Sequence, residues 1–295
     1  MTTKVRETCE TVSVTSKHVR VADTTAIRSF VTEKLIQEKW GTSSRLHVPL
    51  AQPIVFDKDS KPIQLDISFD TFEAEVNFTC VMAMAQFGSG FRVPFHEALN
   101  MGASDAMTRG TVALHQQKHN LDAACLMSLT REDILSSFKV DSASSAPLGV
   151  LAKHILTVFS GAGTALQKAG FKGFHDMVLP HKTAESLIEA LATLIPGFKD
   201  IAVHHGKEVY LLKKAQLCVS DLVLRFASRG LFQYPDADNL TVFVDNVIPC
   251  VLRACKVIEV SPSLAQKIER GEELPTGSDE EVELRACSVV ACERI

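Results

Sequence analysis

Residues 238–253 read Asp-Asn-Leu-Thr-Val-Phe-Val-Asp-Asn-Val-Ile-Pro-Cys-Val-Leu-Arg, and the rest of the chain is organised around this stretch. Half of its side chains are aliphatic or aromatic, so it is too apolar for a surface loop and is predicted to lie inside the fold. A carboxylate, Asp245, stands at its centre. Burying a carboxylate is costly unless partners or a functional cation compensate, so this residue needs a physical reason.

Pro249 follows Asp245 by four residues. Proline is tolerated in the first turn of a helix and biases the preceding residue away from α geometry. Asp245 is therefore predicted to lie just before a helix, with the amide dipoles of the first turn facing it. On this stretch alone, a capping aspartate without chemistry is the commoner role, and a catalytic carboxylate is the alternative.

Length and composition are those of a folded soluble protein. The 295 residues allow one large domain or two ordinary ones, and 46% are hydrophobic and 22% charged. The net charge of −4 and the pI near 6.2 argue against a surface that grips polynucleotide phosphates. Eight cysteines form no Cys-x-x-Cys pair, which favours buried free thiols in a reducing compartment. Without an apolar leader or a membrane-length apolar run, we expect a cytoplasmic protein that does not enter a membrane.

Helical periodicity dominates the pattern, which predicts a mainly α protein. Residues 1–22 alternate weakly and are expected to fray, and residues 23–295 are predicted to form a single compact helical domain. The exception is a small β-hairpin near 201–211, where two β-branched runs flank His-His-Gly-Lys. Helices are predicted over 69–86, 148–166, 213–225, 249–257, 262–270 and 279–294, with a break in the second near Gly161 and Gly163.

Several charged residues have both a structural and a functional interpretation. Lys213 and Lys214 open a helix, where they either hold a phosphate or are simply solvated. Asp221 is expected to pair with a basic residue in the core, and Arg285 to pair with Glu281 one helical turn away. The histidines lack metal-binding spacing, so no metal site and no cofactor are predicted.

Several stretches together resemble the queuosine salvage protein family. The run Leu-Thr-Val-Phe-Val-Asp-Asn-Val-Ile-Pro-Cys-Val-Leu is similar to the family's Leu-Thr-Met-Phe-Ala-Asp-Tyr-Arg-x-Pro-x-Val-Leu. The other similar segments are Val76-Asn77-Phe78, Ser89-Gly90-Phe91, Leu-Leu-Lys-Lys-Ala-Gln-Leu-Cys-Val-Ser-Asp over 211–221, and Glu-Val-Glu-Leu-Arg-Ala over 281–286. Asn246 and Val247 depart from the family's tyrosine and arginine.

The resemblance implies a fold similar to helix-hairpin-helix DNA glycosylases and hydrolysis of the N-glycosidic bond of queuosine 5′-phosphate, which releases queuine for tRNA modification. It implies a catalytic Asp245 that stabilises positive charge at the anomeric carbon. The other implied site residues are Asn77, Phe78 and Phe243 on the base, Lys213 on the 5′-phosphate, and Asp221 and Arg285 supporting the pocket. A small nucleotide is then the partner, with no polynucleotide contact. The alternatives are a catalytically impaired nucleotide-binding protein of the same fold and a nucleic-acid glycosylase.

Overall fold

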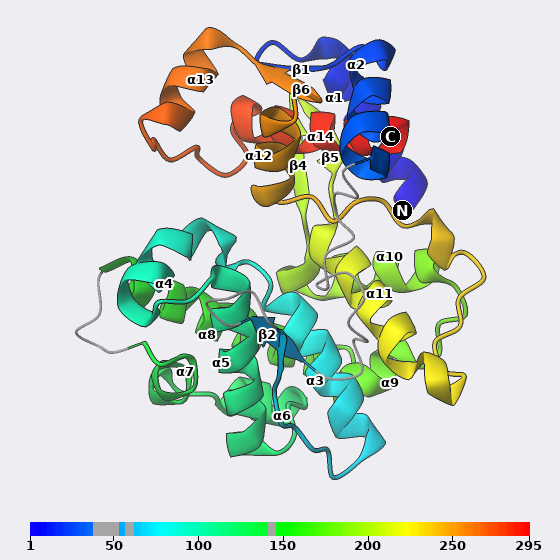
Figure 1. The fold of residues 1–295 in the computed structure, drawn as a ribbon. Coiled ribbons are helices and arrows are strands. Elements are labelled where there is room, and N and C mark those ends of the chain that lie inside the picture. Colours follow the sequence, from blue (N-terminus) through cyan, green and yellow to red (C-terminus); the bar gives the residue numbers. More distant parts are fainter. Residues whose placement is uncertain (38–52, 57–61, 141–145) are drawn as a thin grey trace. The chain divides into compact units, whose positions relative to one another are not determined.

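The structure, a computed structural model, describes residues 1–37, 53–56, 62–140 and 146–295 and is mainly helical, as predicted (Figure 1). Its contacts divide the chain into two compact units, and the single domain expected from the sequence over residues 23–295 stays a prediction. The chain leaves unit 1 and returns to it twice, which a sequence pattern without linkers does not reveal. Unit 1 comprises Met1–His47, Asp200–Lys213 and Asn239–Ile295, and unit 2 comprises Val48–Lys199 and Lys214–Asp238.

Unit 1 combines helices with two small antiparallel sheets. In chain order its elements are α1 (Thr2–Thr15), β1 (Val19–Val21), α2 (Thr24–Ser29), the π-helix η1 (Phe30–Gln37), β4 (Ile201–His204), β5 (Lys207–Tyr210), α12 (Val247–Ala254), β6 (Ile258–Val260), α13 (Pro262–Glu269) and α14 (Asp279–Arg294).

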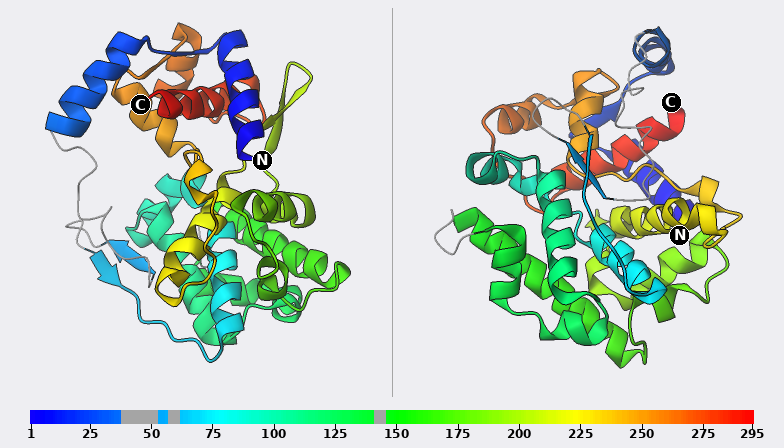
Figure 2. Two further views of the ribbon diagram at one scale, coloured as in Figure 1. Left: turned by 90° about the vertical axis from the view of Figure 1, so that its right-hand side faces the viewer. Right: turned by 60° about the horizontal axis from the view of Figure 1, so that its bottom comes forward.

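The N-terminal segment corrects the expectation that residues 1–22 fray. They form α1 and β1. Val5, Cys9 and Val12 recur at helical spacing and are buried, and α1 crosses and packs against α14 (Figure 2). The helix is rich in threonine and charge, so its narrow apolar stripe was too weak a signal to recognise. β1 pairs with β6, from the other end of the chain, and this pairing was not predicted.

The predicted hairpin is confirmed as β4 and β5, which pair antiparallel from Ile201 with Tyr210 to His204 with Lys207. Its two-residue turn is His205-Gly206, with φ of 48° and 77°. Positive φ at both positions is the type I′ geometry that matches the twist of the flanking strands. The hairpin therefore brings the residue that precedes β4 back beside the residues that follow β5.

Unit 2 is built around buried phenyl rings, among them Phe78, Phe95, Phe159 and Phe174. Its elements are β2 (Ile54–Phe56), β3 (Pro62–Gln64), α3 (Phe72–Met84), α4 (Arg92–Leu99), α5 (Ala103–Lys118), α6 (Ala123–Ser128), α7 (Arg131–Phe138), α8 (Ala146–Lys168), α9 (Phe174–Val178), α10 (Ala184–Leu194), α11 (Lys213–Phe226, whose first residue falls in unit 1) and the 3₁₀ turns η2 (Gly88–Phe91), η3 (Pro196–Phe198), η4 (Ala227–Arg229) and η5 (Ala237–Asn239).

α8 is continuous, so the predicted break near Gly161 and Gly163 is wrong. Gly163 serves close packing: a β-carbon there would lie 2.7 Å from the carbonyl oxygen of Ala123 in α6. Gly161 has no neighbouring atom within 4 Å of such a carbon. A glycine that the sequence reads as a helix breaker is in this case a helix–helix contact point.

Among the described helices, Pro147–Lys168 of α8 is long and apolar enough to cross a membrane, judged by length and composition only. The expectation that no stretch reaches that length is corrected to this extent. Core helices of folded domains meet the same criterion, and α8 buries Leu151, Ile155 and Phe159 completely. It packs against α6 and α7 within unit 2.

Candidate functional site

Asp245 lies just before a helix, as the sequence predicted. α12 begins at Val247, and the Val247 N–H donates to Asp245 Oδ1 at 2.8 Å. The second oxygen, Oδ2, accepts from Lys213 Nζ at 2.9 Å. Val244 is fully buried whereas Val247 is exposed, so the stretch crosses from the core to the surface at Asp245 and is not uniformly buried. The carboxylate side chain retains 21% exposure, which leaves it within reach of a ligand.

Lys213 is the first residue of α11, so the prediction that it opens a helix is confirmed. Leu212, immediately before it, is fully buried and has a φ of 53°. A left-handed conformation is unfavourable for leucine and persists only where surrounding contacts enforce it. The helix therefore starts at an enforced turn that aims the Lys213 side chain at Asp245.

Asp200 supplies the contacts that enforce this turn. Its carbonyl oxygen accepts from the N–H groups of Leu211 and Leu212, each at 3.1 Å. Its carboxylate Oδ2 accepts from the Lys213 N–H at 3.0 Å. One residue thus binds three consecutive amides at the end of the hairpin.

Arg285, on α14, connects Asp200 to the stretch that carries Asp245. Its guanidinium donates to Asp200 Oδ1 at 3.0 Å and Oδ2 at 2.7 Å, the bidentate geometry of strong arginine–carboxylate pairs. It also donates to the Val244 carbonyl at 3.1 Å and to Glu281 at 3.2 Å, which confirms the predicted pair. Burial lowers the pKa of Arg285, but the carboxylates of Asp200 and Glu281 outweigh it and hold this pKa above its usual value.

These contacts close a ring that we call the Asp245 ring: Asp245, Lys213, Asp200, Arg285 and Val244. It runs from the Asp245 carboxylate to the Lys213 ammonium, from the Lys213 amide to Asp200, from Asp200 to Arg285, and from Arg285 to the Val244 carbonyl next to Asp245. All five residues belong to unit 1. Two positive and two negative side chains alternate, so the ring is charge-balanced.

Asp200 is the member of the ring that sequence reasoning missed. A signal was present: a hairpin returns the chain to its starting point, so the residue before its first strand must meet the residues after its second. Asp200 precedes β4 directly, and Lys213 is the third residue after β5.

Asn77 and Phe78 do not join this ring. They lie on α3 in unit 2 and are 0% and 1% exposed. The Asn77 amide donates to Asn120 at 3.0 Å and accepts from the His175 N–H at 3.0 Å. The Phe78 ring packs against Phe69, with centroids 5.3 Å apart. Both residues have packing partners within unit 2, and their contact with a base stays a prediction.

Phe243 and Asp221 are also separated between the units. Phe243 lies half-buried in unit 1, two residues before Asp245. Asp221 lies on α11 in unit 2, where burial raises the pKa of its carboxyl to about 7 against the opposing effect of Arg225. Arg225 itself pairs with Glu75 at 2.9 Å. Arg225, the basic residue one turn from Asp221, thus forms its ion pair with Glu75 and acts on Asp221 only through its charge.

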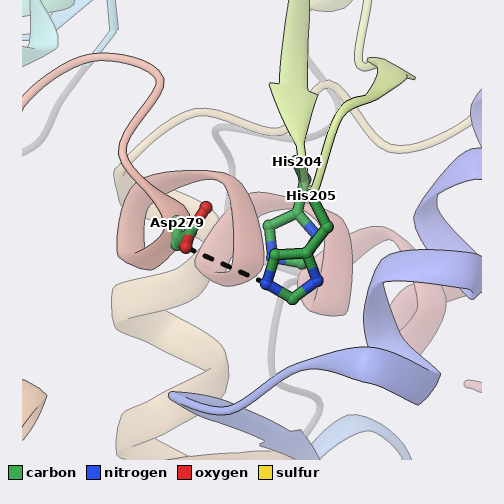
Figure 3. Close-up of side chains that lie close together, drawn as sticks. All are labelled: His204, His205 and Asp279. Carbon is green, nitrogen blue, oxygen red and sulfur yellow. Dashed lines mark ion pairs between the residues drawn. The ribbon is translucent and has the colours of Figure 1, made fainter.

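A group with metal-ligand chemistry, not expected from the sequence, lies at the hairpin turn: His204, His205 and Asp279 (Figure 3). Imidazoles and a carboxylate are typical zinc ligands. The two rings are stacked, with centroids 4.0 Å and planes 29° apart, and one ligand atom of each of the three residues lies within 4.8 Å of the others. His204 Nε2 is moreover 3.2 Å from the buried Glu283 carboxylate. One ring nitrogen of His204 is therefore already occupied by a contact within unit 1.

Glu283 organises the side of α14 opposite Arg285. Its fully buried carboxylate accepts from Ser16 Oγ at 2.5 Å, from the His18 N–H at 2.6 Å and from the Lys17 N–H at 3.1 Å. Burial raises the pKa of this carboxyl, but the hydrogen bonds outweigh it and the pKa lies below its usual value. The residue fastens the connection between α1 and β1 to α14.

Two surface hollows lie among the described residues. One, about 750 Å³, runs between α1 and α14 and is lined by residues such as Thr11, Val14 and Val290. The other, about 340 Å³, is in unit 2 and includes Arg109 and Lys139. Neither is lined by a member of the Asp245 ring.

Comparisons with known proteins point to one family. The model of the family described as "Queuosine salvage protein" matches residues 76–295. A relative from Sphaerobacter thermophilus is 30% identical over 184 residues, covering 62% of this chain and 55% of its own length. A relative from Dictyostelium discoideum is 33% identical over 175 residues, covering 59% and 52%. One from Mus musculus is 27% identical over 183 residues, covering 62% and 54%.

All three relatives carry the name queuosine 5′-phosphate N-glycosylase/hydrolase. The chain spans about half the length of these curated relatives that it matches. The family match itself covers the Asp245 ring entirely, because Asp200, Lys213, Asp245 and Arg285 all fall within residues 76–295.

Proposed function

Because the chain belongs to the queuosine salvage protein family, we propose that it hydrolyses the N-glycosidic bond of queuosine 5′-phosphate and releases queuine. The reaction breaks the bond between the anomeric carbon and the base nitrogen, and the bonding electrons leave with the base. A water oxygen then bonds to the anomeric carbon and gives up a proton, and the departing base takes up a proton at the nitrogen that was bonded to the sugar. Positive charge develops on the sugar before the water bond is complete.

The observation that carries this proposal is the Asp245 carboxylate, partly exposed and fixed on both oxygens by Val247 and Lys213. A rigid negative charge beside the anomeric carbon stabilises the transition state without reorganising during the reaction. Capping alone would explain only the contact with Val247. In this proposal Asp245 acts as the electrostatic stabiliser or the nucleophile.

Lys213 supports the proposal through a partner that the sequence did not predict. Its ammonium is bound to Asp245 and was expected on the 5′-phosphate. An ammonium has three N–H donors, so contact with Asp245 is compatible with a further contact to a phosphate. We assign Lys213 to both, with Arg285 holding the adjacent backbone and Phe243 offering a ring for the flat base.

The remaining expectations stay predictions within this proposal: a fold similar to helix-hairpin-helix DNA glycosylases, a cytoplasmic location, and no direct contact with polynucleotides. The net charge of −4 supports the last of these. Asp221 has no assigned contact with the substrate.

The test is incubation of the purified chain with queuosine 5′-phosphate and chromatographic detection of free queuine over time. Repeated turnover supports the proposal. Binding at one nucleotide per chain without base release would instead favour the nucleotide-binding alternative. Salt-dependent binding to DNA or RNA, with base release from the polymer, would favour the nucleic-acid glycosylase.

A further inference from the structure

We propose that Asp200 is the positioning residue of the Asp245 ring: it sets the separation of the Lys213 ammonium and the Asp245 carboxylate without touching substrate. This inference rests on the proposed function for its effect on the reaction. Its structural part concerns only contacts within unit 1.

Asp200 acts on Lys213 through the main chain. Its carbonyl and carboxylate together bind the amides of Leu211, Leu212 and Lys213 at 3.0–3.1 Å. These contacts hold Leu212 in its left-handed conformation, with φ of 53°. Without them Leu212 would relax toward negative φ, and the first turn of α11 would swing the Lys213 side chain away from Asp245.

Asp200 acts on Asp245 through Arg285. The same guanidinium nitrogen, Nη2, donates to Asp200 Oδ2 at 2.7 Å and to the Val244 carbonyl at 3.1 Å. Val244 is the residue before Asp245, so the carbonyl and the catalytic carboxylate share one backbone segment. The bidentate pair fixes the plane of the guanidinium, and this fixes the position of Val244.

Burial makes these contacts effective. The side chains of Asp200 and Arg285 are 19% and 15% exposed, so water competes weakly for their hydrogen bonds. A surface pair of the same geometry would hold its partners loosely. Asp200 Oδ2 is also shared between the Lys213 amide and Arg285, so a single oxygen joins the two arms of the ring.

The test is Asp200→Asn, which keeps the side-chain shape and the main-chain carbonyl contacts and removes the carboxylate that binds the Lys213 N–H and Arg285. A displacement of about 1 Å in a catalytic group costs ~100-fold in rate. We therefore expect kcat to fall by about 100-fold, because Asp245 acts only as charge develops, and KM to rise as well, because the displaced Lys213 also holds the 5′-phosphate. The matched control is Glu281→Gln, which removes the other carboxylate on Arg285 and leaves the ring intact.

A second readout does not depend on activity. Amide hydrogen exchange is measured at Lys213, which is bonded to Asp200, and at Val247, which is bonded to Asp245. In Asp200→Asn both amides are expected to exchange at least ~10-fold faster, a loss of about 1.4 kcal/mol of protection. In Glu281→Gln both are expected to stay within about twofold of the wild type.

The outcomes separate the two proposals. If the wild type releases no base, the proposed function fails, and the exchange at Val247 still decides the role of Asp200. Unchanged exchange at Val247 in Asp200→Asn, or unchanged kcat in an active enzyme, would overturn the positioning role. Should Asp200→Asn not fold, Arg285→Lys serves instead: it keeps the charge, loses the bidentate contact, and must lower kcat and Val247 protection in the same direction.

Discussion

Replacing Asp245 by asparagine is the perturbation that tests the catalytic proposal most directly. The substitution keeps the size of the side chain and an oxygen that can accept from the Val247 N–H. It removes the negative charge that Lys213 meets at 2.9 Å. The expected change is therefore in the electrostatic stabilisation of the transition state, with the start of α12 preserved.

The magnitude follows from the distances. A carboxylate ~3.5 Å from the anomeric carbon attracts a developing unit charge by about 5 kcal/mol at an effective dielectric constant near 20. The Lys213 ammonium, 2.9 Å from Asp245 Oδ2, would lie no more than about 6.4 Å from the same carbon and oppose it by at least about 2.6 kcal/mol. The pair together leaves a net stabilisation of about 2 kcal/mol.

Asp245→Asn abolishes the attraction and leaves the repulsion. The full attraction of about 5 kcal/mol is lost, which corresponds to a fall in kcat of between ~10³-fold and ~10⁴-fold. The expected change in KM is small, because the charge on the sugar exists only in the transition state.

The assay is single-turnover release of queuine from queuosine 5′-phosphate, with thermal unfolding to confirm that the variant is folded. Asp238→Asn is the matched control: it makes the same substitution seven residues upstream, at an exposed position outside the ring. A rate for Asp245→Asn within tenfold of the wild type would refute the electrostatic role, because even at an effective dielectric constant of about 40 the loss at ~3.5 Å is about 2.4 kcal/mol, or roughly 50-fold.

Three further predictions concern stability. Glu283→Gln should destabilise unit 1 by about 3–5 kcal/mol in urea unfolding, because in either orientation its amide NH₂ faces groups that are themselves N–H or O–H donors. In the wild type, the pKa of the Glu283 carboxyl is lower in the folded than in the unfolded protein. Its contribution to stability is therefore present above the unfolded-state pKa and is lost as pH falls through the folded-state pKa. The carboxyl of Asp221 has a pKa of about 7 in the folded protein, above its unfolded value, so its contribution to stability is present below the unfolded-state pKa and is lost as pH rises through about 7. Asp221→Asn should therefore raise the stability of unit 2 at pH 8. A pH profile of stability that the substitution leaves unchanged would contradict this. Gly163→Ala should destabilise unit 2 by about 1–3 kcal/mol because of the 2.7 Å approach to Ala123, whereas Gly161→Ala, with open space, should stabilise it by up to ~1 kcal/mol in the same denaturation experiment.

Much of the secondary structure could be predicted from local patterns in the sequence. The hairpin was predicted because its turn residues and flanking strands are adjacent in the chain, and α11 and α14 because their apolar periodicity is clear. The pairing of β1 with β6 joins segments about 240 residues apart, which no local pattern encodes. The division into two units escaped detection for the same reason, since unit 1 is assembled from three separate segments.

In the candidate site, too, the sequence revealed the residue that has a local signal and missed the residue that depends on distant contacts. Asp245 was predicted because a charge in an apolar stretch before a proline is conspicuous in the sequence itself. Asp200 was missed because its importance comes from contacts with Lys213 and Arg285, 13 and 85 residues away. Asn77 and Phe78 were chosen by resemblance, and the structure shows what they pack against in unit 2, so their contact with a base stays a prediction.

The Asp245 ring supports the second of the two interpretations of the central stretch, the catalytic carboxylate that we propose. A capping aspartate needs only the Val247 amide and gains nothing from a lysine held in place by a left-handed leucine. A plain ion pair needs no second pair behind it, and a partly buried one returns little net stability after desolvation. In this arrangement, one carboxylate at the edge of the core is held in place by a strained leucine and two half-buried ion pairs. Such rigidity has a physical use where charge appears briefly beside the carboxylate, because a preorganised group stabilises that charge without having to move.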